Sequence, residues 1–316
     1  MNNSSVRYVS WASPSLLPLV LAVISMACSE NRSAEHPSRA GDSREVIRIT
    51  DQSGSETWIG DGLEAIRFGD RADTSTRHQL CNSRGFSLEF SLRADSNSLS
   101  FLSPVSVLKQ HAPAGSFKQY TLKISQQTDS SLTLVPVSDE ACAFFGNKPR
   151  LFFRKQAFAV DRTLRFDKIV FHTTECFGTC SVFHMEIDSA RQIRQHTEVL
   201  YRQTRRDSTR EGYFTGKLPD STYQKFVAAL KTSNLRQLDA DEILCCDAPI
   251  ITIILYANGK RKPFRTMLFP PIVAQNLVNV LYQIAGDQLG TRIDKPVVLE
   301  GWNGKPSTDP GNIVVQ

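Results

Sequence analysis

The 316-residue sequence lacks the short motifs by which common enzyme classes are recognised. It contains no Gly-x-Ser-x-Gly elbow, no His-Glu-x-x-His pair, no phosphate-binding glycine-rich loop and no dinucleotide fingerprint. Its six histidines are scattered along the chain. The sequence therefore predicts no catalytic residue and no cofactor, and it favours a non-enzymatic role without excluding catalysis.

A strong charge of either sign is also missing. The formal net charge of +5 is small for this length, so nucleic acid is not expected as a partner. Hydrophobic residues make up 41% of the chain and charged residues 22%, which are ordinary values for a soluble globular protein. The chain is thus long and apolar enough to build a core, in one large domain or two ordinary ones.

One apolar run stands out, at the N-terminus. It extends from Leu16 to Ile24, follows Arg7, and is too short to span a bilayer as a mature helix. Small residues then precede Cys28, as a secretory cleavage site requires. This segment resembles a bacterial lipoprotein signal of the looser Bacteroidetes type, with Ser25 where leucine is usual. The resemblance implies a signal peptide over residues 1–27 and a lipid on Cys28; the alternative is an ordinary cleaved signal.

Residues 28–45 are predicted to be a flexible tether. The stretch is polar, charged and interrupted by glycine and proline, so it cannot bury enough surface to fold. With a lipid on Cys28, the protein would be anchored to a membrane of the bacterial cell envelope and face the periplasm or the cell surface. No other partner follows from the sequence.

Residues 46–160 are predicted to form a β-rich domain, an antiparallel barrel or sandwich. Apolar and polar residues alternate in several short runs separated by turn residues, and no helical period is visible. These runs are EVIRIT (45–50), FSLEFSLRA (86–94), YTLKISQQTDSSLTLVPV (120–137) and RLFFRK (150–155). Together with TWIG (57–60), the TDSSLTLVP hairpin gives this half a weak resemblance to small lipocalin-like envelope domains.

Residues 161–290 are predicted to form an α+β domain, an antiparallel sheet covered on one face by two helices. A helix after Pro219 and another from about Pro271 to Gly286 each carry one apolar stripe. Asp220 or Ser221 is the expected N-cap of the first helix. Residues 291–316 are expected to be an irregular tail that Trp302 pins. The strands are expected at 166–174, 181–188, 197–203, 212–218 and, as a hairpin around Asn258-Gly259, 249–269.

The seven cysteines leave six after lipidation of Cys28. An even number in an exported protein favours disulfides. Cys81 and Cys142 are the two in the first half, so a bond between them is the economical expectation. Cys245 and Cys246 cannot pair easily with each other, because consecutive Cα atoms are only about 3.8 Å apart.

The stretch CFGTC, from Cys176 to Cys180, permits three interpretations. A redox centre is disfavoured, because a strand rather than a helix follows and Glu175 would raise a thiol pKa. A metal site could use Cys176, Cys180, Cys245 or Cys246, Asp247, His172 and His184. His184 shares strand parity with Cys180, so both would face one side. A disulfide is favoured, either within the loop or to Cys245 or Cys246, and Phe177 is expected to fold inward.

The stretch CFGTCSVFHMEI resembles the Cys-Phe-Gly-x-Cys-Pro-x-Tyr signature of an uncharacterised bacterial domain family of unknown function. GYFTGKLPDSTYQKFVAAL, CDAPIITIILYANGKRK and PPIVAQNLVNVLYQIAG resemble its later segments in order, so the likeness covers about Phe166 to Gly286. Ser181 in place of proline and the additional Cys245-Cys246 pair depart from it. The signature carries only the loop cysteines, which implies a Cys176–Cys180 bond.

These observations predict an exported, lipid-anchored envelope protein that acts as a binding or accessory module. The resemblance brings no activity with it. The alternative is a metal-binding or thiol-active protein built on Cys176, Cys180, Cys245 and Cys246.

Overall fold

The computed structural model describes residues 56–69, 78–82, 87–95, 97–104, 117–238, 248–267 and 270–302. All of them belong to one compact unit, Ala40–Gln316. The predicted signal peptide, Cys28 and the tether lie outside the described residues, as do Cys245, Cys246 and the run EVIRIT. The predicted division into domains stays a prediction.

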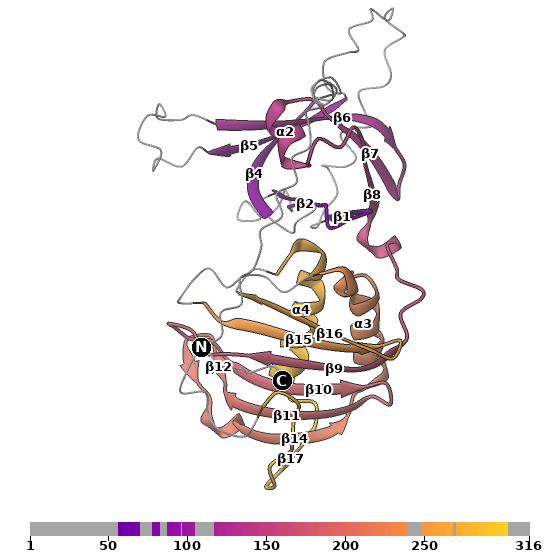
Figure 1. The fold of residues 1–316 in the computed structure, drawn as a ribbon. Helices are drawn as coiled ribbons and strands as arrows, with labels where there is room; N and C mark the ends of the chain where they lie inside the picture. The colour runs from indigo at the N-terminus through magenta and orange to yellow at the C-terminus, as the bar shows by residue number, and fades with distance from the viewer. Residues whose placement is uncertain are drawn as a thin grey trace, which may run out of the picture. The chain divides into compact units, whose positions relative to one another are not determined.

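The N-terminal part is a closed antiparallel barrel of eight strands (Figure 1). Each strand pairs with the next along the chain, and the last pairs with the first through Trp58 opposite Lys155. The strands are β1 Glu56–Gly60, β2 Ala65–Phe68, β3 His78–Cys81, β4 Ser87–Ala94, β5 Ser98–Pro104, β6 Phe117–Gln127, β7 Ser131–Pro136 and β8 Leu151–Lys155. Of the two expected architectures, the barrel is therefore the one observed.

The barrel interior is filled by the apolar residues of the alternating runs, because successive strand residues point to opposite faces. Trp58, Phe101 and Phe153 are the largest of these buried side chains. One short helix, α2 (Asp139–Phe144), adds Ala141 to this core, and its C-cap residue Phe145 adds another buried side chain. The N-cap Ser138 accepts a hydrogen bond from the Ala141 amide at 3.3 Å. The sequence shows no helical period in this half, because a helix of six residues is too short to display one.

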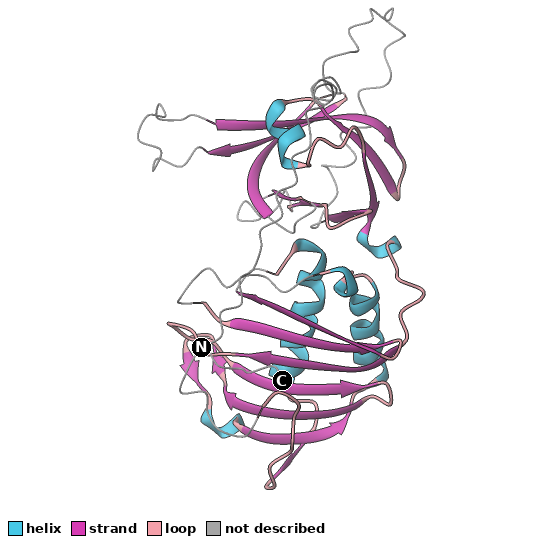
Figure 2. Cartoon of the chain, viewed as in Figure 1, coloured by secondary structure: helices cyan, strands magenta, loops and turns pink. Residues whose placement is uncertain are grey.

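The C-terminal part is a seven-stranded antiparallel sheet in the order β16-β15-β9-β10-β11-β14-β17 (Figures 1 and 2). The strands are β9 Phe166–Thr173, β10 Val182–Asp188, β11 Gln192–Val199, β14 Gly212–Lys217, β15 Ile250–Ala257, β16 Lys260–Met267 and β17 Thr291–Ile293. The two-residue strands β12 (Tyr201–Arg202) and β13 (Arg205–Arg206) form a separate small hairpin. Asn258 (φ 55°) and Gly259 (φ 70°) form the predicted turn between β15 and β16, where both positions have positive φ.

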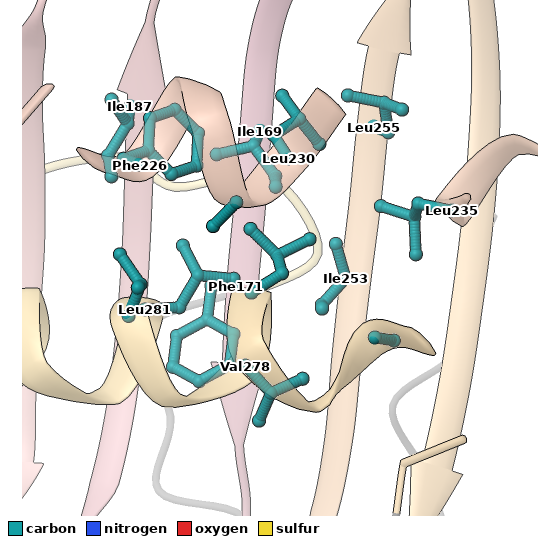
Figure 3. Close-up of a cluster of buried hydrophobic side chains, with 14 of the residues drawn as sticks. Ile169, Phe171, Ile187, Phe226, Leu230, Leu235, Ile253, Leu255, Val278 and Leu281 are labelled. Atoms are coloured by element: carbon teal, nitrogen blue, oxygen red, sulfur yellow. The ribbon is translucent and has the colours of Figure 1, made fainter. Parts of the chain in front are cut away.

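Two helices cover one face of this sheet, α3 (Asp220–Lys231) and α4 (Ile272–Asp287). Figure 3 shows side chains from both helices meeting side chains of the strands. Buried apolar residues of this layer include Ile169, Phe171, Ile187 and Ile253 from the strands, Phe226 and Leu230 from α3, and Val278 and Leu281 from α4. The predicted α+β layer is confirmed, and it leaves the other face of the sheet without a helix from the described residues.

Three details differ from the sequence expectation. β11 begins at Gln192, five residues earlier than expected, and β17 adds a strand to a tail that was expected to be irregular. The N-cap of α3 is Pro219, with no side-chain cap bond, rather than Asp220 or Ser221.

Among the described residues, no helix combines the length and apolar character that crossing a membrane requires.

Candidate functional site

The CFGTC loop is closed by a Cys176–Cys180 disulfide, with the two Cα atoms 5.7 Å apart. The loop connects β9 to β10, so the bond holds together the end of that hairpin. Phe177 at its tip is 91% exposed. The predicted disulfide within the loop is confirmed, whereas the expectation that Phe177 folds inward is wrong: the short loop holds its ring out into solvent.

Cys81 and Cys142 are buried but are not bonded to each other. Cys81 Sγ on β3 lies 3.6 Å from the carbonyl oxygen of Asn82, and Cys142 Sγ on α2 lies 3.7 Å from that of Pro136. The expected Cys81–Cys142 disulfide is therefore wrong. No local pattern in a single sequence shows that strand β3 and helix α2 place their sulfur atoms against different backbone carbonyls.

The metal set built on cysteine also needs correction. Disulfide sulfurs do not supply the thiolates that bind zinc, so Cys176 and Cys180 are not ligands in this form of the protein. Cys245, Cys246 and Asp247 lie outside the described residues. His172 and His184, by contrast, are both buried on the face of the sheet opposite α3 and α4, which we call the open face.

Three histidines occupy one cross-strand row on that open face. His172 on β9 is directly opposite His184 on β10, which is directly opposite His196 on β11. The row continues on one side through Thr252 of β15 and on the other through Tyr213 of β14. Residues paired directly across an antiparallel sheet have Cβ atoms about 4.5–5.5 Å apart, so the pairing register alone brings the three rings together.

Hydrogen-bond distances connect the first two rings to the backbone and to a carboxylate. His172 Nε2 lies 2.6 Å from the carbonyl oxygen of Glu300, and its Nδ1 lies 3.1 Å from Nδ1 of His184. His184 Nε2 lies 3.2 Å from Oε2 of Glu198. A carbonyl oxygen only accepts, so His172 carries its proton on Nε2 and accepts on Nδ1 from the Nδ1–H of His184.

Burial sets the charge of the two outer rings. Loss of solvation lowers the pKa of His172 to about 4, and the neighbouring His184 lowers it in the same direction. The same two causes, in the same order, lower the pKa of His196 to about 4. Both rings are therefore neutral at pH 7, and each keeps one nitrogen lone pair.

The side chains that offer ligand atoms here are His184, His196 and Glu198. One ring nitrogen from each histidine and one carboxylate oxygen all lie within 4.8 Å of one another. Glu186, two residues from His184 on the same face, is engaged elsewhere: it accepts from the Arg194 guanidinium and, at 2.7 Å, from the backbone amide of Glu300. The arrangement can hold a cation between imidazole and carboxylate.

A turn from Leu299 to Trp302 covers this row. The Glu300 side chain accepts from Lys168 at 2.9 Å and from Arg261 at 3.3 Å, which anchors the turn to the open face. Gly301 has φ +73°, and a Cβ there would lie 3.3 Å from Nε2 of His172. The turn lies this close to the histidine row because it has no side chain at that position.

Trp302 stacks on two of the three rings. Its indole lies 5.0 Å from the centre of the His184 ring and 4.4 Å from that of His196, with interplanar angles of 23° and 29°. The expectation that Trp302 pins the tail agrees with this contact. The indole therefore reports directly on the environment of both histidines.

Buried polar atoms without a hydrogen-bond partner gather at this row. Of seven such side-chain atoms among the described residues, five lie in the row or over it. They are His196 Nδ1, Thr252 Oγ1, Trp302 Nε1 and two guanidinium nitrogens of Arg265, which pairs with Thr252. A buried polar group without a partner costs about 1–3 kcal/mol. Such a concentration in one place marks a site that a bound group would satisfy.

Sequence reasoning identified His172 and His184 but missed His196, Glu198 and the approach of Trp302 to them. A signal was present: His184-x-Glu186 and His196-x-Glu198 are two His-x-Glu pairs on neighbouring strands. In a hairpin that turns near Ala190, the first histidine falls opposite the second. With β11 expected to begin at Thr197, His196 lay outside any predicted strand.

The comparison with known families agrees with the resemblance seen in the sequence. Residues 167–280 match the model of a family described as a domain of unknown function (DUF6438). The match runs from the start of β9 into α4 and so includes His172, His184, His196 and Glu198. No curated protein and no solved structure matches the chain.

Proposed function

We propose that this is an exported, lipid-anchored protein of the bacterial cell envelope whose C-terminal domain is a non-enzymatic binding module. Cys28 would carry the lipid, residues 28–45 would be the tether, and the open face of the seven-stranded sheet would hold the ligand. The Cys176–Cys180 bond supports export, because disulfides persist in oxidising compartments outside the cytosol.

The observation that carries the binding role is the buried row under the Leu299–Trp302 turn. Its unpartnered polar atoms would be satisfied by a ligand, and Trp302 gives it an aromatic cover. Thiol chemistry, the alternative function, receives less support, since Cys176 and Cys180 form a disulfide that leads into a strand.

Metabolic labelling with an alkyne-tagged fatty acid tests the anchor. Wild-type protein should take up the label and fractionate with membranes, whereas the Cys28→Ser precursor should be unlabelled. A Cys81→Ser variant, altered at a buried cysteine of the barrel, serves as the matched control and should label like wild type. Equal labelling of wild type and Cys28→Ser would contradict the lipid anchor.

A further inference from the structure

The contact between His184 and Glu198 requires a cation between the two side chains. His184 donates through Nδ1 to His172, so a neutral His184 presents a lone pair on Nε2. That lone pair lies 3.2 Å from a carboxylate oxygen of Glu198, which offers lone pairs as well. Two acceptors at this distance repel each other unless a cation lies between them, either a proton on Nε2 or a metal ion.

The distances suit a metal ion. Ligands bound tetrahedrally to zinc at about 2.0–2.1 Å lie roughly 3.3 Å from one another. The 3.2 Å between His184 Nε2 and Glu198 Oε2 already matches that spacing. One ring nitrogen of His196 lies within 4.8 Å of a ring nitrogen of His184 and of a carboxylate oxygen of Glu198, so a shift of about 1.5 Å would complete a three-ligand set.

The surroundings of His184 are those of a metal ligand. A metal-bound histidine usually donates its second ring N–H to a neighbouring acceptor, which fixes the tautomer and the ring orientation. Here the acceptor is His172, which is fixed in turn by the Glu300 carbonyl at 2.6 Å. Among the described residues, His184 is the one basic side chain that pairs with Glu198, so the carboxylate is not committed to a second cation.

We propose that His184, His196 and Glu198 bind one divalent transition-metal ion, with zinc as the occupant that the ligand set suits. Two imidazoles and one carboxylate favour zinc and its neighbours, whereas magnesium and calcium prefer all-oxygen sites. Three protein ligands leave a fourth position for water or another small ligand. The inference deepens the proposed binding role and rests on it, because it places a cation on the same open face. The unpartnered N–H groups of Trp302 and Arg265 are donors and would be satisfied by an acceptor on a further ligand, not by the metal ion.

Calorimetric titration of the purified wild-type chain in detergent, stripped with EDTA and dialysed, tests the site. Zinc chloride should bind with one ion per chain, and magnesium chloride should give no binding. Glu198→Gln should weaken zinc binding at least 100-fold, and His184→Ala and His196→Ala should do the same. His172→Gln should weaken it about 10- to 100-fold, since it removes only the partner that orients His184.

Two matched controls and an optical readout complete the experiment. Glu140→Gln on α2 and His78→Gln on β3 remove the same groups from the barrel and should leave zinc affinity unchanged. Zinc should change the tryptophan fluorescence of the chain, and Trp302→Phe should abolish that change while the stoichiometry stays at one. Glu198 is partly exposed, so Glu198→Gln remains informative if a buried histidine variant fails to fold.

Absence of zinc binding by the wild-type chain would overturn the metal site, and so would an unchanged zinc affinity in Glu198→Gln. Fatty-acid labelling of Cys28 is read independently, so failure of the anchor and failure of the metal site give different results.

Discussion

At the scale of single residues, Gly301 controls how closely the C-terminal turn approaches His172. Gly301→Ala adds a Cβ 3.3 Å from Nε2 of His172 at a positive φ. We expect the turn to move away and Trp302 to become more exposed, which acrylamide quenching of tryptophan fluorescence would detect. Gly146→Ala is the matched control, because Gly146 has φ +66° with no atom within 4 Å. Both variants should lower the free energy of unfolding, because alanine is strained at a positive φ. Equal quenching in the two variants would contradict the close approach of Gly301 to His172.

The neutral histidines make a prediction about pH. The pKa of His172 and that of His196 are about 4 in the folded protein, against about 6.5 in an unfolded chain. The unfolded state therefore binds more protons between these values, and the free energy of unfolding should fall as pH drops from about 6.5 to about 4. Urea unfolding in EDTA measures this. His172→Gln, which cannot be protonated, should lose less over the interval, and an equal loss would contradict a buried neutral His172.

At the scale of elements, the disulfide fixes the end of the β9–β10 hairpin that carries His172 and His184. The closed loop is short, so chain entropy predicts a loss of only about 2 kcal/mol when Cys176 and Cys180 are both changed to Ser. Urea unfolding under native, oxidising conditions tests this value. Phe177→Ser, which alters the same loop at an exposed position, should change stability by less than about 0.5 kcal/mol. If both variants lost the same amount, the bond would not be the cause.

Elements with a strong local signal were predictable from sequence. Both main helices follow apolar stripes, and the Asn258-Gly259 turn follows from the positive φ that its two positions need. β11 was expected five residues late, because two of the buried residues that alternate along it, Gln195 and Thr197, are polar and hide the period-2 pattern. The error hid His196, because a histidine that is not assigned to a strand cannot be paired with a residue on the neighbouring strand.

The functional site depends on register between strands, which a single sequence does not state. His184 and His196 are twelve residues apart, and only the hairpin turn decides that they face each other. The return of Trp302 over both rings is a contact across more than one hundred residues and leaves no local pattern. Cys81 and Cys142 show the reverse error: an even count suggested a pair that β3 and α2 do not form.

At the scale of the whole molecule, the barrel and the sheet have largely separate hydrophobic cores. The core under α3 and α4 draws its buried residues from the C-terminal part with the exception of Ile59 of β1. Residues 160–316 should therefore fold alone and unfold cooperatively, as circular dichroism under oxidising conditions would show. The same fragment carrying Phe171→Asp, a charge in that core, should not fold. A fragment without a cooperative transition would mean that the two parts depend on each other for stability.

The central claim is that one metal ion lies between His184, His196 and Glu198, and anomalous X-ray scattering tests it most directly. Crystals of the protein grown with zinc should be measured on both sides of the zinc absorption edge. The account predicts one strong anomalous peak about 2.0–2.2 Å from His184 Nε2, a His196 ring nitrogen and a Glu198 carboxylate oxygen. A map with no peak in this row, with His184 Nε2 and Glu198 still 3.2 Å apart as a bare pair, would contradict it.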